Sequence, residues 1–408
     1  MAWGSPTTAH LTESIRQWGF RTADNKTTIT EFIYQTLRNN GDAETDINFE
    51  TIISVIEELI VFYSPFNSRS KTPSLLSGFF TARYEKELLH YSIEGGTARH
   101  GYQLQIPPRT NYPLSNRAYH DETPNQSFFQ QLLSALLMSI NATVQEYAYH
   151  TPSSPLDSVE SDASVSFVNW IGRFAEGRVL RLYTLNYERI LKILMTRAGL
   201  SVFEGFDCGA DIDHHLLLRA NVPRILTDID SHTHYNLHGS AFWQVQGLDK
   251  DQLPNPEIIM GGVLALAADN PVCIQIEKGK TLLVTNILTG YQKAQRGMVT
   301  PFRQMQAAFD RDSCSASEIY IIGYSFGDEH INESIKTAIR HNEKLRITIV
   351  DPYFIKNGME HQLGLRFFPF RQDVNMRATR VSDSLYSYFD GAFTVHTVGF
   401  EEFLESHK

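Results

Sequence analysis

Short apolar runs alternate with segments of helical period along the second half of the chain, and this alternation constrains the fold more than any other feature. Helix-like segments such as residues 188–199 and 302–309 stand between the apolar runs. Parallel neighbours in a sheet need a crossover connection, usually a helix, so this pattern predicts an α/β fold with a doubly wound, mostly parallel sheet. The strand-like runs span residues 178–187, 234–240, 281–288, 318–326 and 346–352.

The front of the chain has a different texture, because its periodicity is helical. Apolar residues recur at helical spacing in residues 7–18 and 48–63, and Thr7 or Thr8 is suited to cap the first helix. Residues 126–149 form a third, strongly apolar helical segment. We therefore expect a group of helices ahead of the sheet.

A stretch rich in Ser, Pro and Asp, residues 150–164, has the composition of a linker between these two parts. We predict that residues 1–20 and 161–408 form the sheet-containing domain. Residues 21–160 are then a helical insertion or assembly module.

Composition excludes several classes of protein. The 408 residues are 42% hydrophobic, which is enough for a sizeable core, and 36 basic against 46 acidic residues give a net charge of −10. Without a basic run, tight binding to a nucleic acid backbone is disfavoured. No apolar run approaches the ~20 residues of a membrane helix. Isolated cysteines at 208, 273 and 314 favour reduced thiols, so we expect a cytoplasmic protein.

The stretch EIYIIGYSFGDEHIN, residues 318–332, joins a strand-like run to a helix through small residues. Asp328 is well placed to cap that helix. The free N–H groups of a helix N-terminus suit a phosphate or ribose. Because the glycines are spaced G-x-x-x-G and not G-x-G-x-x-G, a plain strand-turn-helix corner is the alternative.

Polar residues end three further strand-like runs. Asp351 follows the run that begins at Arg346, at an offset where an acidic residue holds ribose hydroxyls in dinucleotide sites. Asn186 and His238 end two others, and a histidine there can act as a general base near neutral pH. Alternatively, Asn186 is a cap and His238 a structural hydrogen-bonding residue.

Histidines at 232 and 234 share one face of a strand-like run, which raises a metal site as an alternative. A metal needs three or four convergent ligands with supporting groups behind them. The other candidates, around DIDHH at residues 211–215, fall on expected loops. We therefore predict no metal.

Several of these segments stand in a characteristic order, with TLNYE at 184–188, LHGSAFW at 237–243, IIGYSFGDEHIN at 321–332 and VDP at 350–352. In this order they resemble the SIR2-like family, specifically its bacterial anti-phage defence branch. Two further segments agree with the resemblance, NFETIISVIEEL at 48–59 and VFEGF at 202–206.

The resemblance implies a Rossmann-like NAD-binding domain with an inserted helical module. It also implies an NAD+ glycohydrolase that releases nicotinamide and ADP-ribose and depletes NAD+ during phage infection. Asn186 would orient the attacking water or the ribose, and His238 would serve as general base or hold the ribose hydroxyls. The residues that would bind NAD+ are Gly4, Thr184, Gly323, Tyr324, Ser325, Asp328 and Asp351.

Deacylase members of the family carry two pairs of cysteines around a zinc module, and the three cysteines here lack such pairing. We therefore expect no zinc and no protein deacylation. The family also begins with a strand and a GAGxS loop that cradles the pyrophosphate. Here residues 4–6, Gly-Ser-Pro, match the Gly-x-Pro that follows this loop. The resemblance therefore implies either that the natural chain starts upstream of Met1, which we favour, or that part of the site has been lost. Without the loop, we expect weak or no hydrolysis from this chain alone.

Two alternatives follow from the resemblance. A catalytically impaired module would bind NAD+ or an ADP-ribose derivative as a sensor. An assembly subunit would act only with a partner, since relatives form homo-oligomers, sometimes with a HerA-type ATPase or a short Argonaute. The apolar helices at 48–63 and 126–149 could supply such contacts.

Overall fold

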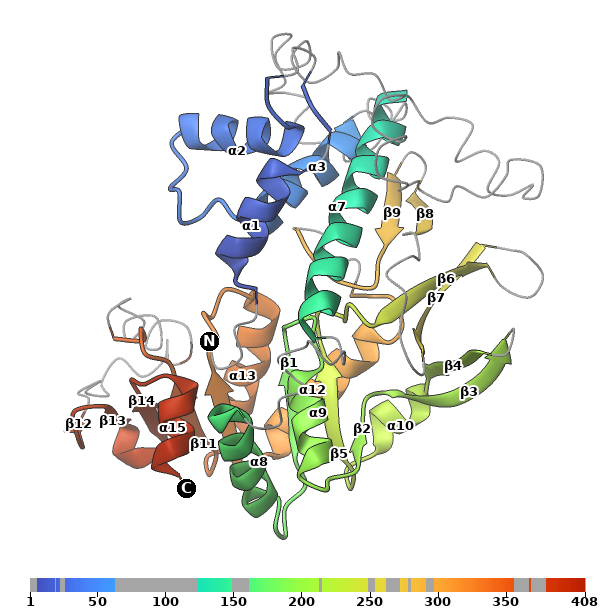
Figure 1. Ribbon diagram of the computed structural model, residues 1–408. Coiled ribbons are helices and arrows are strands. Elements are labelled where there is room, and N and C mark those ends of the chain that lie inside the picture. The colour runs from blue at the N-terminus through green and yellow to red at the C-terminus, as the bar shows by residue number, and fades with distance from the viewer. Residues whose placement is uncertain are drawn as a thin grey trace.

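The protein is described by a computed structural model in which helices, parallel strands and antiparallel strands occupy separate regions (Figure 1). The structure describes residues 6–18, 20–22, 26–62, 124–148, 161–212, 215–248, 254–261, 272–277, 280–290, 297–355, 367 and 379–407. Residues 63–123 of the expected helical insertion (21–160) and most of the expected linker lie outside these residues, as does Gly4.

Parallel strands form the centre of the molecule, as the alternation predicted. One sheet has the order β1-β5-β2, and all its pairs are parallel. A second sheet, to its left in Figure 1, has the order β10-β11-β14-β13-β12, in which the first three strands are parallel. The bounds are β1 Arg181–Thr184, β2 Val202–Phe203, β5 His232–Asn236, β10 Glu318–Ile322, β11 Arg346–Val350, β12 Thr379–Arg380, β13 Leu385–Tyr388 and β14 Phe393–His396. The prediction of an α/β protein with parallel sheets is confirmed.

Strands β1 and β10 are edge strands within the described residues, and no ladder joins them. Their side chains nevertheless enter the same two apolar clusters. Leu182 and Tyr320 pack on the cluster that contains Trp170, whereas Tyr183 packs on the cluster that contains Ile321. Both strands are therefore covered on both faces, and in the described part of the chain each has one unpaired edge.

Six helices border these strands. The helix α8 packs against α9 and α15, and α12 packs against α13 and α10. Their amphipathic stripes bury apolar residues against the sheet, which stabilises each helix more than its intrinsic propensity does. The bounds are α8 Asp162–Phe174, α9 Ile190–Arg197, α10 Val222–Thr227, α12 Phe302–Ser315, α13 Glu329–His341 and α15 Phe400–Ser406.

An antiparallel region projects from the parallel strands on the right of Figure 1, and the sequence did not predict it. It has a four-stranded sheet of order β3-β4-β7-β6 and a separate β8-β9 hairpin, of which only the last strand was expected. Short strands broken by Gly, Asp and Pro show no clear period, which explains the error. The bounds are β3 Phe206–Ile212, β4 His215–Ala220, β6 Trp243–Leu248, β7 Pro254–Gly261, β8 Val272–Glu277 and β9 Lys280–Val284.

The helices at the front form a group above the sheet in Figure 1, as expected. They are α1 Thr8–Gln17, α2 Ile29–Asn39, α3 Phe49–Phe62 and α7 Pro124–Ala148. Thr7 caps α1 by accepting a hydrogen bond from His10 N at 3.0 Å, which confirms one of the two expected caps. The helix α1 packs against α2, α3 and α7, while the boundary proposed at residue 20 stays a prediction.

The C-terminal end of α7 reaches down to the upper end of β1 in Figure 1. The same apolar cluster that fills the helix group continues into the sheet region through Tyr187, Ala241 and Ile287. Helices and sheet therefore share one core, and the helix group rests on the carboxyl ends of the strands.

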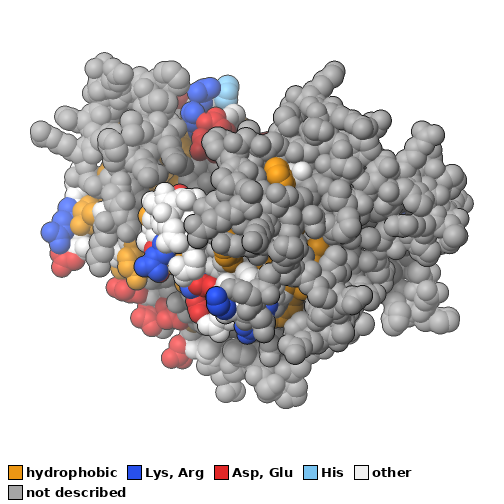
Figure 2. Space-filling model, turned by 90° about the horizontal axis from the view of Figure 1, so that it is seen from above, with side chains coloured by type: hydrophobic (Ala, Val, Ile, Leu, Met, Phe, Trp, Pro, Cys, Tyr) orange, Lys and Arg blue, Asp and Glu red, His pale blue; other side chains and the backbone are white. Residues whose placement is uncertain are grey.

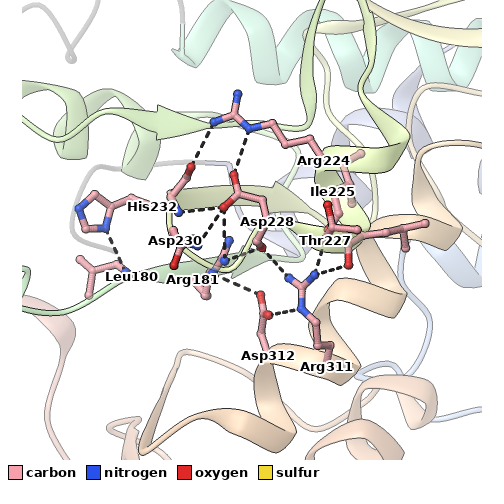
Figure 3. A network of polar contacts seen from close by, with 12 residues as sticks. Leu180, Arg181, Arg224, Ile225, Thr227, Asp228, Asp230, His232, Arg311 and Asp312 are labelled. Atoms are coloured by element: carbon pink, nitrogen blue, oxygen red, sulfur yellow. Dashed lines mark hydrogen bonds and ion pairs between the residues drawn. The ribbon is translucent and has the colours of Figure 1, made fainter.

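Charged side chains cross-link the opposite, amino ends of β1 and β5 (Figure 3). Asp312 accepts hydrogen bonds from the Arg311 Nε atom at 2.7 Å and from the Tyr183 hydroxyl at 2.5 Å. The side chains of Arg181 and Arg311 each donate to the Asp228 carbonyl oxygen, at 2.6 and 3.1 Å. This network ties α12 to the loop before β5.

The Asp228 carboxylate is also fully engaged in this network. It accepts from Arg224 Nε at 3.0 Å and from the backbone N–H groups of Asp230 and Ser231 at 3.0 and 2.9 Å. Although burial opposes its ionisation, these hydrogen bonds hold the pKa of Asp228 well below its usual range. The network is therefore charged and internally paired.

The surface seen from above shows basic and acidic side chains interspersed among its described residues (Figure 2). On the described part of this face there is no broad field of one sign. Among the described residues, no helix is both long and apolar enough to cross a membrane.

Candidate functional site at the carboxyl ends of the parallel strands

Loops at the carboxyl ends of four parallel strands carry most of the predicted site residues. Asn186 follows β1 and His238 follows β5, two residues beyond each strand. Gly323 and Asp351 directly follow β10 and β11. Since each pair of strands is parallel, the two ends in each sheet lie at one edge, where open α/β sheets bind ligands.

His238 and Asp328 are brought together from different sheets. The His238 Nε2 atom lies 3.9 Å from Asp328 Oδ1, and His238 is only 3% exposed. This distance is too long for a hydrogen bond but places the carboxylate where it stabilises a protonated imidazole. The two residues therefore form an acid–base pair that no spacing in the sequence revealed.

Asp328 occupies the N-cap position of α13, as expected, but its side chain makes no capping hydrogen bond. The carboxylate lies instead beside His238. A negative charge at this position is favoured by the positive end of the helix dipole.

His330 was not predicted as a site residue. Its ring centroid lies 5.6 Å from that of His238, with 36° between the ring planes, and the residue is exposed. It lies two positions after Asp328, in the first turn of α13. Only the approach of α13 to the loop after β5 makes it a neighbour of His238.

The loop between β10 and α13 is held by its own hydrogen bonds. The Tyr324 hydroxyl accepts from Asp328 N at 3.2 Å and lies 3.0 Å from both the Asp328 carbonyl oxygen and Asn332 Oδ1. Asn332 Nδ2 donates to Phe326 O at 2.9 Å. Gly323 and Phe326 have positive φ angles of 61° and 58°, and for Phe326 this conformation is strained. The loop is therefore fixed in an unusual conformation, with Ser325 exposed.

The loop after β1 is fixed in a similar way. Asn186 N donates to Thr184 Oγ1 at 3.0 Å, and Asn186 Nδ2 donates to Glu188 Oε1 at 3.3 Å. Asn236 Nδ2, at the end of β5, donates to the carbonyl oxygens of Asn186 and Glu188 at 2.9 and 3.1 Å. Burial raises the pKa of Glu188. Thr184 is buried and holds the backbone of Asn186, which is itself exposed.

Tyr187 joins three parts of the site. Its carbonyl oxygen accepts from Ser240 Oγ at 3.0 Å and from Ala241 N at 2.9 Å, next to His238. Burial, followed by the negative charges of Glu50 and Asp328, raises the pKa of its hydroxyl well above the usual range. The helix α3, which carries Glu50, therefore reaches the same place as the loops after β1 and β10.

Asp351 is less directly connected. Its Oδ1 atom accepts a hydrogen bond from Tyr353 N at 2.7 Å, which is the turn expected of an Asp-Pro sequence at a strand end. Gly323 N donates to Val350 O at 3.1 Å and so links the ends of β10 and β11. The role of Asp351 in holding a ribose stays a prediction.

The two histidines of the metal alternative have other environments. His232 Nδ1 accepts a hydrogen bond from Leu180 N at 3.0 Å. His234 is buried beside Glu204, and burial lowers its pKa to about 4. Within the described ranges, no group of three or more His, Cys, Asp or Glu residues is arranged to hold a metal ion.

The fold and these loops define an α/β protein with a polar site at the carboxyl edge of parallel strands. Comparison with protein-family models gives no match, and neither does comparison with curated proteins. The arrangement of the residues themselves therefore carries the functional argument.

Proposed function

We propose that the chain is a SIR2-like NAD+ glycohydrolase with a Rossmann-like, doubly wound sheet, acting in anti-phage defence by depleting NAD+. The observation that carries this proposal is the convergence of the His238–Asp328 pair with the Asn186 loop at one edge of parallel strands. Polar groups that meet there, from three separate strand ends, fit the position at which nucleotides bind.

The reaction needs few groups. Water attacks C1′ of the nicotinamide riboside as the bond from C1′ to the pyridinium nitrogen breaks, and the bonding electron pair neutralises that nitrogen. The water proton passes to His238, so the products are nicotinamide, ADP-ribose and a proton. An oxocarbenium-like transition state with a good leaving group requires mainly positioning and one weak base.

The remaining residues have distinct tasks in this mechanism. Asp328 stabilises the imidazolium form of His238, and Asn186 orients the water or the ribose. Gly323, Tyr324 and Ser325 present the loop backbone and the α13 N-terminus to the adenosine side, with Asp351 on the next strand. The exposed position of Ser325 and the internal bonding of Tyr324 agree with a preformed binding surface.

Within the part of the chain that the structure describes, β1 and β10 are edge strands, and their position supports a location for the substrate. In the SIR2-like family, the first strand leads into the GAGxS loop that cradles the pyrophosphate. β1 and β10 are the edges with which such a strand would pair, and they are covered on both faces. We infer that NAD+ lies across the junction between these two strands, with nicotinamide near His238.

Incubation of the purified protein with NAD+ tests the proposal, with nicotinamide and ADP-ribose followed by chromatography. The expected result is hydrolysis in the wild type and a loss of about a hundredfold or more in His238→Ala and Asn186→Ala. A matched control is His341→Ala, a histidine at the far end of α13. Hydrolysis that persists unchanged in both site variants would show that the roles are wrong.

A second candidate function is a sensor that binds NAD+ or an ADP-ribose derivative without turnover. The near-complete burial of His238 favours it, because a base closed off from solvent is poorly placed to accept a proton from water. Calorimetry that shows binding of NAD+ without release of nicotinamide would support the sensor. A homo-oligomer, a HerA-type ATPase partner and a cytoplasmic location stay predictions.

A further inference from the structure

The turn that carries His238 makes several hydrogen bonds with Asn286, which lies two positions beyond β9. Asn286 Nδ2 donates to the carbonyl oxygens of Ser240 and Trp243 at 3.1 and 3.0 Å. Its own carbonyl oxygen accepts from Ser240 N at 3.1 Å. The side-chain amide and the backbone carbonyl of Asn286 thus hold residues 240–243, just after His238.

The packing around this contact leaves no slack. Gly239 has φ +86°, and a Cβ placed there would lie 2.1 Å from Asn286 O, so only glycine fits. Leu288 N donates to the carbonyl oxygen of His238 itself at 2.8 Å. A movement of Asn286 therefore has to move the backbone at His238 and in the residues that follow it.

Asn286 is in turn held by the helix α7. Its Oδ1 atom accepts a hydrogen bond from Asn141 Nδ2 at 2.9 Å. Gln145 lies one helical turn further along α7. Its Nε2 atom donates directly to Ala241 O, in the loop that carries His238. Two contacts thus run from one face of α7 to the loop of His238, since residues four apart lie on the same side of a helix.

Other contacts make the same region a junction between helices and sheet. The Glu57 carboxylate of α3 packs so closely on Gly290 that a Cβ there would lie 2.6 Å from Glu57 Oε2. Residues 285–290 are therefore fitted between α3, α7 and the loop after β5. Displacement of either helix would therefore move residues 285–290 first, and the sheet only through them.

We propose that Asn286 is a positioning residue for His238, and that it transmits the position of α7 to the imidazole. Its importance for hydrolysis rests on the proposed function, whereas its effect on the His238 ring does not. Anything that shifts α7, such as association of the helical module with another copy or a partner, would change the position of His238 through the Asn141–Asn286 contact. The helix group would then influence the position of His238 as well as pack over the site.

The test compares Asn286 with a matched asparagine at the opposite edge of the sheet. Asn342 Nδ2 also donates to two carbonyl oxygens, those of Cys314 and Ala316, at 3.3 and 2.8 Å, but far along the chain from the His238 turn. Asn286→Ala, Asn286→Asp, Asn141→Ala and Asn342→Ala are prepared in the full chain. Asn286→Asp keeps the acceptor for Asn141 and the side-chain shape while it removes both donated bonds. Asn141→Ala leaves both of those bonds in place, which guards against a simple failure to fold.

Two readouts are taken from each variant. The first is the position of the His238 ring resonances in the spectrum of protein with labelled histidine, assigned with His238→Gln. The second is the kcat and KM of NAD+ hydrolysis. We expect both Asn286 variants to shift the His238 resonances and to lower kcat about tenfold or more, with KM within about threefold, because a small misplacement of a catalytic group is costly. Asn342→Ala should change neither.

The contact with α7 is tested by combining variants. Asn141→Ala should give a smaller change of the same kind, and it should add little in an Asn286→Ala background, since the two residues act through one contact. Unshifted His238 resonances in both Asn286 variants would overturn the proposal, as would equal shifts in Asn342→Ala. If the wild type hydrolyses no NAD+, the proposed function fails, and the resonances alone decide the positioning role.

Discussion

The two ends of the same parallel strands use polar residues in opposite ways. At the amino ends, Arg181, Asp228, Arg311 and Asp312 bind one another and the backbone between them (Figure 3). At the carboxyl ends, the Asp328 carboxylate stands 3.9 Å from His238, with the exposed His330 ring close by. Charges that satisfy each other stabilise a fold, whereas charges held apart can bind and react with something else.

The difference also appears in how the backbone is supported. The amino-end carboxylates accept hydrogen bonds at 2.5–3.0 Å from side chains and N–H groups. At the carboxyl ends, hydrogen bonds from Asn236, Asn286 and Tyr324 are donated to the loop backbone, whereas the Asp328 carboxylate lies 3.9 Å from His238 Nε2. Substitutions should therefore affect stability at one edge and chemistry at the other.

The largest effect is expected at the amino edge, from Asp312→Ala. This substitution leaves Arg181, Arg311 and the Tyr183 hydroxyl without their shared acceptor, in a site where the Asp312 side chain is only 8% exposed. We expect a loss of about 3–5 kcal/mol in the free energy of unfolding, measured with denaturant. Activity per folded molecule should be unchanged. A loss below about 1 kcal/mol would mean that the network adds little to stability.

The second effect is a pH dependence of the free energy of unfolding. It comes from His234, which lies in the middle of β5 and so between the two edges. Burial lowers its pKa to about 4 from 6.5. As the pH falls from above 6.5 toward 4, His234 binds a proton in the unfolded chain but stays neutral in the folded protein. The free energy of unfolding therefore decreases. The full difference corresponds to about 3 kcal/mol.

The measurement for His234 is the free energy of unfolding at pH 7 and at pH 4.5, in the wild type and in His234→Phe. The variant lacks the titrating ring, so its stability should fall less over this range. His232→Phe, which removes the other histidine of β5, serves as control. Parallel curves for the wild type and His234→Phe would contradict the assignment.

A third effect, on chemistry, is expected from Asp328→Asn at the carboxyl edge. The substitution keeps the side-chain shape and removes the charge that stabilises protonated His238. We expect kcat for NAD+ hydrolysis to fall about tenfold, equivalent to about 1.4 kcal/mol, with little change in stability because the pair is long and partly exposed. A large loss of stability without loss of kcat would reverse the proposed contrast between the edges.

The smallest effect is expected from Tyr324→Phe, which tests the loop support alone. Removal of the hydroxyl breaks the contacts with Asp328 and Asn332, at a cost of about 1 kcal/mol to stability. KM for NAD+ should rise, since the loop is proposed to face the adenosine. Tyr320→Phe is the control, because that ring packs on Trp170 in the apolar layer. Equal KM values for Tyr324→Phe and Tyr320→Phe would show that the loop between β10 and α13 does not contribute to NAD+ binding.

The parallel strands and the antiparallel strands differ in how well the sequence predicts them. The strands β1, β5, β10 and β11 and the polar residues that end them were predicted, because buried parallel strands are apolar runs with clear limits. The antiparallel strands β3, β4, β6, β7 and β8 were missed, since their short segments carry no such period. Asn286 was read only as part of a strand, and nothing in its neighbourhood signalled contacts with residues 141 and 240.

The sequence by itself determined the class of the fold, the helices at the front and the residues that end each parallel strand, because these follow from local period and from strand-end chemistry. Only the tertiary structure decided that Asp328 faces His238, that His330 lies beside them and that α7 holds the His238 turn through Asn286. Each of these contacts joins residues far apart in the chain or on different elements. Their distances depend on how helices and sheets pack, and the periodicity of a single segment carries no information about that packing.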